Sequence, residues 1–338
     1  MNNRKLSRFR PIAKGFTLVE LMIALSIGLV LFAGVMSVFV GMRTTTVETS
    51  SFGELQENGR FAISVLTDDL LRQNFWGDLS GTFSQSSLTT IPGAPGNDCV
   101  GGGVNNATFP QAIGPFRTLW GQTIAAGALD PLGCFIMPAN TQTMVGSDVI
   151  QIKRVISNPV AVPVVGNYYL SSNLSTGGVF AAGAAVPVVN NGRLWQYQHH
   201  VYYVRQETVG NNLVPVLMQG RLTNLSMNFS PVIDGIEMIR FMYGVDTTTD
   251  PSLPGYGVVN AYISAGAMNQ NLWDNAGGSR ILAVKMFVLA RGALPDPQYN
   301  NTNTYQLGDL AFPVNDNFRR LLFSSTVTLY NTSVDSWP

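Results

Sequence analysis

The stretch AKGFTLVELMIALSIGLVLFAGVMSVFVGM, residues 13–42, decides how this chain is built. It is a long apolar run in which residues 21–42 carry no charge, and Glu20 is its only acid. About 20 consecutive apolar residues are enough to cross a bilayer as a helix. The run therefore predicts a membrane-spanning helix, and it raises the question of why one carboxylate stands near its start.

A basic leader precedes this run. Five cations and no acid fall in the first fifteen residues: Arg4, Lys5, Arg8, Arg10 and Lys14. Such a leader is expected to stay in the cytoplasm, so that the chain after Met42 emerges on the far side of the membrane. A secretory signal would have a shorter apolar region followed by a small-residue cleavage site, and this run has neither. The plain alternative at this point is the signal anchor of an arbitrary membrane protein.

The composition describes a folded protein with a mildly acidic body. The 338 residues are 46% hydrophobic and only 12% charged, which is enough apolar material for a core. Lysine plus arginine and aspartate plus glutamate each number 20, so without the five leader cations the net charge would be −5. Nucleic acid is therefore not expected as the main partner, because binding phosphates requires a basic patch.

The helical pattern continues beyond the membrane. Apolar or small residues recur every three or four positions at Phe52, Leu55, Gly59, Ala62, Leu66 and Leu70. No proline occurs between Pro11 and Pro92. We predict one helix from about Thr17 to Phe75, with a membrane half at residues 16–42 and an amphipathic half at residues 43–76.

After Trp76 the composition changes to loop-rich β structure. Residues 77–146 are dominated by Gly, Ser, Thr, Asn and Pro, and turn-rich insertions follow at 246–257 and 292–311. The predicted strands are 148–155, 195–205, 213–222, 236–245, 281–290 and 321–330. The fold class is therefore α+β, with the long N-terminal helix packed on an antiparallel β-sheet domain, residues 77–338, that carries long loop insertions.

The two cysteines, Cys99 and Cys134, lie in Gly- and Pro-containing loops. They could be two unrelated buried thiols or a disulfide. An exported body would lie in an oxidising compartment, which favours the disulfide. Such a bridge would stabilise the fold by roughly 3 to 4 kcal/mol in the chain-entropy model.

Enzyme and cofactor motifs are missing from the sequence. There is no phosphate loop, no dinucleotide fingerprint, no H-E-x-x-H and no G-x-S-x-G, so neither catalysis nor a cofactor is expected. His199 and His200 are adjacent in a predicted strand, where they would point to opposite faces and could not easily share a metal ion. Asp246 and Asp250 in the loop DTTTDPSLPGYG could hold Ca²⁺, but a solvated turn is favoured because the EF-hand order is missing.

GFTLVELMIAL, residues 15–25, resembles the processing site of type IV prepilins and of the pseudopilins of type II secretion. The resemblance implies that a prepilin peptidase removes residues 1–15 by cutting after Gly15. It also implies that Phe16 becomes an N-methylated terminus, and that Glu20 docks on the new terminus of a neighbouring subunit. Many major pilins have a proline where this chain has Ser37, so a loosened helix segment is not implied for this subunit.

Glu20 also has a physical reason to seek a partner. A lone carboxylate inside hydrocarbon costs on the order of 2.5 to 3.5 kcal/mol by insertion scales. A free α-amine at Phe16 of a neighbour would neutralise it and favour staggered docking of the two helices. The alternative is a carboxylate that reaches the nearby cytoplasmic interface.

Three longer segments resemble the PilW-type minor pilins: RFAISVLTDDLLRQNFWGD (60–78), VIDGIEMIRFMYGVD (232–246) and NFRRLLFSSTVTLYN (317–331). They imply a structural subunit that primes assembly of a type IV pilus at the inner membrane and sits at the tip, with a periplasmic body before assembly. Twitching motility, adhesion and DNA uptake would depend on the filament. The implied partners are other minor pilins and the major pilin through the N-terminal helix, the prepilin peptidase, and the inner-membrane assembly platform.

Three other functions stay open from sequence. A J-type minor pseudopilin would have the same N-terminal helix but would belong to a type II secretion system. A membrane-anchored enzyme or binding module would keep its leader and have a polar cleft. An adhesive tip, in which the Gly- and Asn-rich insertions bind a surface, is compatible with the pilin interpretation.

Overall fold

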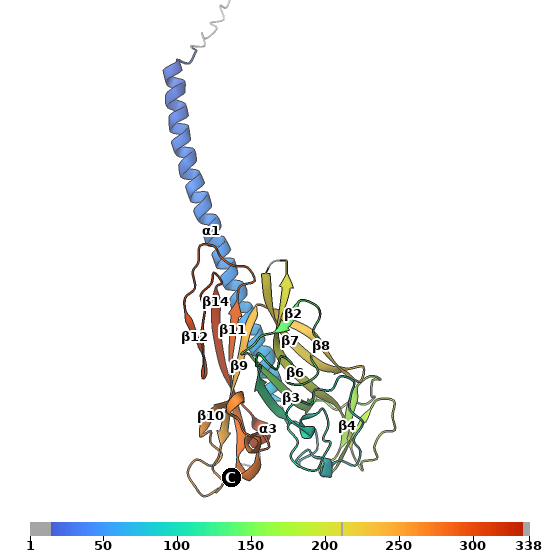
Figure 1. The fold of residues 1–338 in the computed structure, drawn as a ribbon. Helices are drawn as coiled ribbons and strands as arrows, with labels where there is room; N and C mark the ends of the chain where they lie inside the picture. Colours follow the sequence, from blue (N-terminus) through green and yellow to red (C-terminus); the bar gives the residue numbers. More distant parts are fainter. Residues whose placement is uncertain (1–14, 211, 334–338) are drawn as a thin grey trace, which may run out of the picture. The chain divides into compact units, whose positions relative to one another are not determined.

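The computed structural model describes residues 15–210 and 212–333, so most of the predicted leader lies outside the described residues. The chain divides into two compact units, Met1–Gly53 and Glu54–Pro338. Helix α1, Leu18–Leu71, contributes residues to both units (Figure 1). The second unit contains antiparallel β-sheets, so the chain has the predicted α+β fold.

The first unit is helical from Leu18 onward. Its segment Leu18–Met42 has a mean hydropathy of 2.5 and is long and apolar enough to cross a membrane. The side chains of this segment are exposed on all sides. An apolar helix with no buried face needs lipid or other helices around it, which agrees with the predicted membrane half.

Helix α1 ends four residues before the predicted end at Phe75. Asn74 adopts the left-handed conformation with φ of 59°, which stops a right-handed helix and which asparagine tolerates better than most residues. The backbone N–H of Asn74 then donates to the carbonyl of Lys153 at 3.2 Å. The chain therefore leaves the helix by bonding to a strand of the second unit.

The end of α1 buries the predicted apolar stripe in the second unit. Leu55, Ala62, Leu66 and Leu70 are all buried, whereas Phe52, which belongs to the first unit, is 40% exposed. A Cβ on the buried Gly59 would lie 2.1 Å from the ring of Phe323, so only glycine allows this close approach.

The larger sheet has eight strands, and every pairing between them is antiparallel. Strand β6, Arg193–Val209, is central because it pairs with β2, β3, β4 and β7. The other strands are β1 (Leu119–Thr123), β2 (Thr141–Thr143), β3 (Asp148–Val155), β4 (Tyr168–Ser172), β5 (Gly177–Ala181), β7 (Asn212–Thr223) and β8 (Ser226–Asp234).

A second sheet has the order β10-β9-β11-β14, and β12 and β13 form a separate hairpin. These strands are β9 (Ile236–Asp246), β10 (Ala261–Ser264), β11 (Arg280–Arg291), β12 (Thr304–Leu307), β13 (Leu310–Pro313) and β14 (Arg320–Thr328). The short helices are α2 (Gln270–Trp273) and α3 (Tyr330–Ser333), with 3₁₀ turns at Gln85–Ser87, Val104–Asn106, Ala265–Ala267 and Ala276–Gly278.

One hydrophobic core joins these parts. The same buried cluster contains Leu66 of α1, Tyr203 of β6 and Val284 of β11. All six predicted strands are present within a few residues of their predicted bounds. Strand β8 is not among them, because its sequence SMNFSPVID is polar and contains a proline. A strand tolerates proline at a sheet edge, and β8 is such an edge because among the described strands it pairs only with β7.

Candidate functional site

The predicted processing segment lies at the very start of α1. Gly15 and Phe16 precede the first helical residue, and Phe16 is 86% exposed. The peptide bond between them is thus outside regular structure and accessible, which is what a peptidase requires of its substrate.

Glu20 closes the first turn of the helix with Thr17. The backbone N–H and the hydroxyl of Thr17 donate to Oε2 of Glu20 at 3.0 and 2.8 Å, and the N–H of Glu20 donates to Oγ1 of Thr17 at 3.3 Å. This reciprocal pattern is a capping box. The T-x-x-E spacing is a sequence signal for such a box, and the prediction of Glu20 as a docking residue does not include this local role.

Glu20 forms no ion pair with any residue in 15–210 or 212–333. It is the sole charged side chain in residues 18–42 and it is exposed. The capping box satisfies some of its hydrogen bonds but brings no opposite charge. A neutralising cation would therefore have to come from outside these residues.

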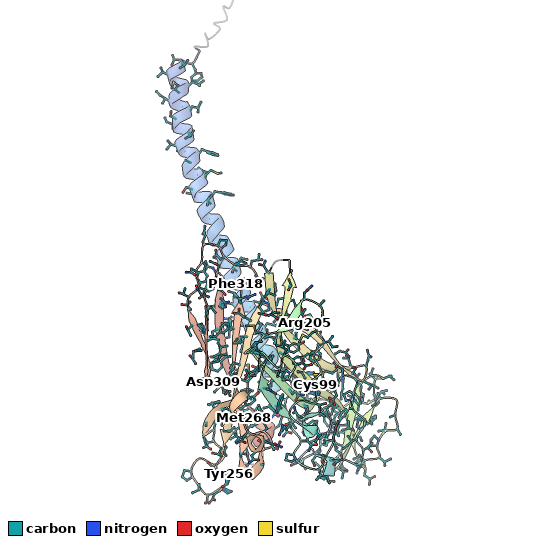
Figure 2. The ribbon with its side chains drawn as sticks, in the orientation of Figure 1. Cys99, Arg205, Tyr256, Met268, Asp309 and Phe318 are labelled. Atoms are coloured by element: carbon teal, nitrogen blue, oxygen red, sulfur yellow. A yellow bond between two sulfur atoms is a disulfide. The ribbon has the colours of Figure 1, made fainter. Side chains whose placement is uncertain are left out.

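The predicted disulfide between Cys99 and Cys134 is present, and both residues are buried. Figure 2 labels Cys99. The bridge lies beside a tight approach of two loops, because a Cβ on Gly101 would be 2.0 Å from the carbonyl oxygen of Pro131. Asp130 fixes the second loop by accepting backbone N–H bonds from residues 132–135. The disulfide thus links two loops of the loop-rich region to each other, and both of its cysteines belong to the hydrophobic core.

Lys153 of β3 forms hydrogen bonds to the same loop region. It is fully buried, and its Nζ donates to the carbonyls of Asn106 and Arg117 at 2.7 and 2.8 Å. Burial lowers the pKa of Lys153, while the charge of Asp98 opposes that shift. Its bonds to two carbonyls indicate a structural role, because they hold the segment between those residues against the sheet.

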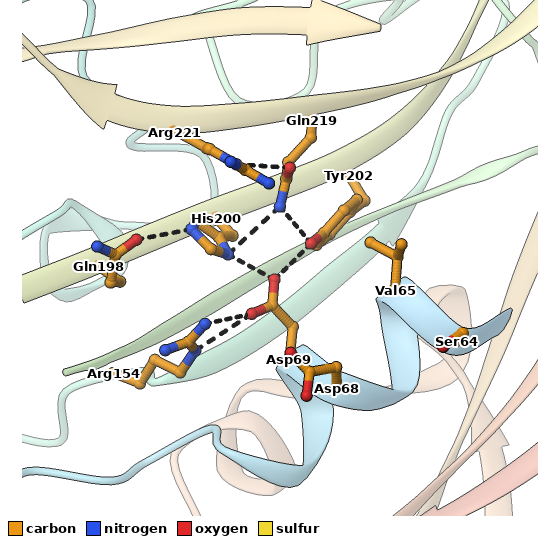
Figure 3. A pocket seen from close by; sticks show the side chains of 10 residues that line it. All are labelled: Ser64, Val65, Asp68, Asp69, Arg154, Gln198, His200, Tyr202, Gln219 and Arg221. Atoms are coloured by element: carbon orange, nitrogen blue, oxygen red, sulfur yellow. Dashed lines mark hydrogen bonds and ion pairs between the residues drawn. The ribbon is translucent and has the colours of Figure 1, made fainter. Parts of the chain in front are cut away.

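A polar cluster joins α1 to the large sheet, and we call Asp69, Arg154, His200 and Tyr202 the Asp69 cluster (Figure 3). Oδ1 of Asp69 accepts from Nε and Nη2 of Arg154 at 3.2 and 2.6 Å. Oδ2 accepts from the hydroxyl of Tyr202 and lies 2.5 Å from Nδ1 of His200. One carboxylate on the helix therefore contacts two strands, β3 and β6.

The Asp69 carboxylate is only 3% exposed. Burial alone would raise its pKa, but the attraction and hydrogen bond of His200, the charge of Arg154 and the Tyr202 hydroxyl hold the pKa of Asp69 well below its usual value. Burial, and then the charge of Asp69, raise the pKa of Tyr202, so its hydroxyl keeps the proton it donates.

The Asp69 cluster lines a pocket of about 440 Å³. The remaining lining residues are Ser64, Val65, Asp68, Gln198, Gln219 and Arg221. The polar groups of the cluster mainly bond one another, and the pocket contains no cysteine, lysine or activated hydroxyl that could act as a nucleophile. These bonds clamp the end of α1 to the large sheet.

The two histidines point to opposite faces of β6, as predicted. Nδ1 of His199 lies 2.9 Å from Oγ1 of Thr108, whereas Nδ1 of His200 faces Asp69. The interpretation of both as ordinary strand residues misses the pair between His200 and Asp69. The sequence offers no signal for this pair, because 131 positions separate the two residues.

The loop 246–257 is held by hydrogen bonds from its backbone N–H groups to its own aspartate side chains. Oδ1 and Oδ2 of Asp246 accept the N–H groups of Thr248 and Gly257 at 2.8 and 2.7 Å, and Asp250 accepts from Ser252. Among the described residues, no group of three or more His, Cys, Asp or Glu side chains could hold a metal ion. These contacts are those of a hydrogen-bonded turn.

The second and third segments that resemble PilW-type proteins meet in the smaller sheet. Glu237 of β9 is buried, and its carboxylate accepts from Nε and Nη2 of Arg320 in β14 at 2.5 and 2.9 Å. Arg291 of β11 donates to the same carboxylate at 3.2 Å, and Arg320 also binds Asp316. The acid of one segment and an arginine of the other therefore form one buried network across three strands.

Comparison with known families gives two matches. Residues 201–331 match type IV pilus-assembly protein W, and residues 10–36 match the prokaryotic N-terminal methylation motif. No curated protein and no solved structure matches the chain. The first match contains Glu237 and Arg320, and the second contains Gly15, Phe16 and Glu20. The chain thus carries a domain of the type IV pilus-assembly protein W family together with the N-terminal methylation motif of prepilin-type pilins.

Proposed function

We propose that this protein is a minor pilin of a type IV pilus, a structural subunit without catalytic activity that helps to prime assembly and sits at the pilus tip. One observation carries the proposal. A methylation motif and a pilus-assembly W domain lie on one chain. The accessible bond between Gly15 and Phe16, directly before the apolar helix, supports it.

Processing would follow from the position of that bond. A prepilin peptidase would cut after Gly15 and remove residues 1–15, and Phe16 would become the methylated terminus. Residues 16–42 would stay in the inner membrane, and residues 43–76 and 77–338 would lie in the periplasm until assembly. The basic leader would keep the N-terminus cytoplasmic, in accordance with the positive-inside rule.

Glu20 would be the docking residue. It is the single charge in residues 18–42, the apolar half of the helix, and forms no ion pair with any of the described residues. A new α-amine on Phe16 of a neighbouring pilin would supply that cation, and the cost of a lone carboxylate in hydrocarbon would then favour association. Other minor pilins and the major pilin would meet this chain through their helices, on the inner-membrane assembly platform.

The Asp69 cluster would connect this helix contact with the outer domain. When the helix is held in a filament, a load on the domain passes through the contacts between the end of α1 and the sheet. A buried ion pair resists separation more than an exposed one, because each charge loses its partner without regaining water. Twitching motility, adhesion and DNA uptake would depend on the filament that contains the chain.

The test of this proposal is Glu20→Gln in cells that lack the wild-type copy. Glutamine retains the shape of the side chain and can still accept the N–H of Thr17, so only the charge is lost. We expect normal expression and processing, with strongly reduced incorporation into pili. Glu54→Gln, an exposed acid later in the same helix, is the matched control and should incorporate normally. Normal piliation by Glu20→Gln cells would refute the docking role.

A further inference from the structure

The chain between β11 and β14 leaves the second sheet and returns to it. These two strands pair as far as Arg291 and Arg320, and the segment that joins them contains the β12–β13 hairpin. We call residues 302–315 the flap. In the described residues, β12 and β13 form a sheet of their own, and no strand pairing joins the flap to the second sheet. The flap can therefore move without breaking a sheet.

The base of the flap is fixed. The N–H of Gly292 donates to the carbonyl of Arg319 at 3.0 Å, and Asn301 and Asp316 exchange two backbone hydrogen bonds at 2.7 and 3.1 Å. Asn301 is fully buried, and its Nδ2 donates to the carbonyl of Phe318 at 2.9 Å. These contacts form a neck that holds both ends of the flap together, as a hinge requires.

The flap covers one face of the second sheet. Its turn touches β9, since a Cβ on Gly308 would lie 2.8 Å from Cγ of Met242. Leu307 packs with Met238 and Leu289 in a small cluster that is separate from the main core. The structure describes every residue of the flap, and Leu307 is the one among them that is buried. The apolar residues of β9 and β11 that face the flap form what we call the covered strip: Met238, Met242, Phe287 and Leu289.

An ion pair latches the tip of the flap to the sheet. Nε and Nη2 of Arg240 in β9 donate to Asp309 at 3.0 and 2.9 Å, and the side chain of Asp309 is 44% exposed. Nη1 of Arg240 donates to the buried Asp148 at 2.9 Å and to Thr123 at 2.6 Å. When Asp309 moves away, Arg240 keeps Asp148 and Asp309 gains water. Opening therefore leaves no buried charge unpaired, which is the main cost of breaking a buried ion pair.

Opening of the flap needs far less free energy than unfolding of the domain. A hairpin of two strands is marginally stable by itself, so the flap depends on its contacts with the sheet. Those contacts are one buried leucine, a few half-buried neighbours and an ion pair whose acid is nearly half exposed. An ion pair that reaches solvent contributes little stability. Segments with so few buried apolar contacts open locally while the rest of the fold stays intact.

We propose that the flap is a hinged cover, fixed at its neck and latched by Asp309 and Arg240, which opens as a unit and uncovers the covered strip. The closed flap blocks any contact with this strip, and the open flap exposes it while both sheets stay intact. The inference concerns the second unit alone and does not depend on the proposed function in a pilus.

The experiment compares two buried methionines on opposite faces of the second sheet. Met238 lies under the flap, whereas Met286 of β11 belongs to the main core, and their exposed fractions are 1% and 0%. The full chain in detergent is treated with hydrogen peroxide, which oxidises a methionine whose sulfur it can reach. Mass spectrometry of peptides gives the initial rate at each position. The variants are Asp309→Ala and a control, Asp78→Ala, which removes an ion pair outside the flap.

We expect wild-type Met238 to be oxidised about tenfold faster than Met286 or more, because only a larger unfolding event exposes Met286. Asp309→Ala should raise the rate at Met238 about two- to fivefold and leave the rate at Met286 unchanged, since it weakens the latch alone. Asp78→Ala should change neither rate.

A disulfide across the tip of the flap provides the reverse test. The contact between Gly308 and Met242 is close enough for Gly308→Cys and Met242→Cys to be joined. This bridge, verified by peptide mapping, should lower the rate at Met238 to that at Met286. The inference is overturned if the two wild-type methionines are oxidised at the same rate, if Asp309→Ala accelerates both equally or neither, or if Met238 reacts as fast with the bridge in place.

Discussion

The apolar half of α1 and the domain that follows treat charge in opposite ways. In residues 18–42 the one charge is Glu20, which is exposed and bonds only within its own helical turn. In the unit from Glu54 onward, Asp69 and Glu237 are buried and held by arginines from distant strands. The domain thus neutralises these two buried acids internally, whereas Glu20 has no cation among the described residues, as its proposed docking role requires.

The largest effect should come from removing a buried acid. Asp69→Asn would leave Arg154 without its anion in a buried site, and we expect a loss of about 3 to 5 kcal/mol in the free energy of unfolding. The matched control is Asp68→Asn, one residue away, whose carboxylate is 56% exposed and pairs with Arg72. That change should cost about 0 to 1 kcal/mol. Urea unfolding followed by tryptophan fluorescence measures both, and equal losses would contradict the contrast.

The lowered pKa of Asp69 predicts that acid destabilises the domain. The pKa of Asp69 is lower in the folded chain than in the unfolded chain, so its contribution to stability is complete above the unfolded value near 4. The contribution is lost as the pH falls from there through the folded pKa. Unfolding free energy should therefore decline below about pH 4, and part of that decline should be missing in Asp69→Asn. Parallel acid profiles for the two proteins would exclude this role.

Loss of the disulfide should be nearly as costly. Replacing Cys99 and Cys134 together by serine opens a loop with a sequence separation of 35 and should destabilise the fold by roughly 3 to 4 kcal/mol. The companion measurement adds reductant to the wild-type chain. Reduction of the bridge should lower the melting temperature. A double variant as stable as wild type would show that the loop region holds without it.

A smaller loss is expected at the helix–sheet contact. Gly59→Ala would place a methyl group 2.1 Å from the ring of Phe323. Overpacking of this kind costs about 1 to 3 kcal/mol, from which the better helix propensity of alanine subtracts up to about 1 kcal/mol. Gly53→Ala, where no atom lies within 4 Å of the added Cβ, should stabilise α1 slightly. Thermal melts that shift in the same direction for both variants would argue against the contact.

The smallest effect should come from the capping box. Thr17→Val removes the hydroxyl that bonds Glu20 and should weaken the helix start by about 1 kcal/mol, with no change in the unfolding of the domain. Thr17→Ser keeps the hydroxyl and serves as control. Hydrogen exchange at residues 18–21 in detergent is the readout. Protection that stays the same in Thr17→Val would show that the capping box does not hold this turn.

Sequence predicts the helix, its buried stripe, six of the strands and the disulfide, because these follow from local periodicity, from composition and from the compartment. It does not predict the Asp69 cluster or the network around Glu237. Their members lie 131 and 83 positions apart, and only the fold brings them together. The weak strands β4 and β5 escape prediction for a related reason. Their Gly- and Ser-containing sequences carry little local preference, and they form because β4 pairs with β6 and β5 pairs with β4.

The central claim is that the apolar helix begins at a processed terminus, and the most direct test is the N-terminus of the chain isolated from membranes and from pili. Mass spectrometry of the N-terminal peptide should find N-methylated Phe16, with Gly15 and all residues before it gone. A chain that still begins at Met1 in both fractions would contradict the claim.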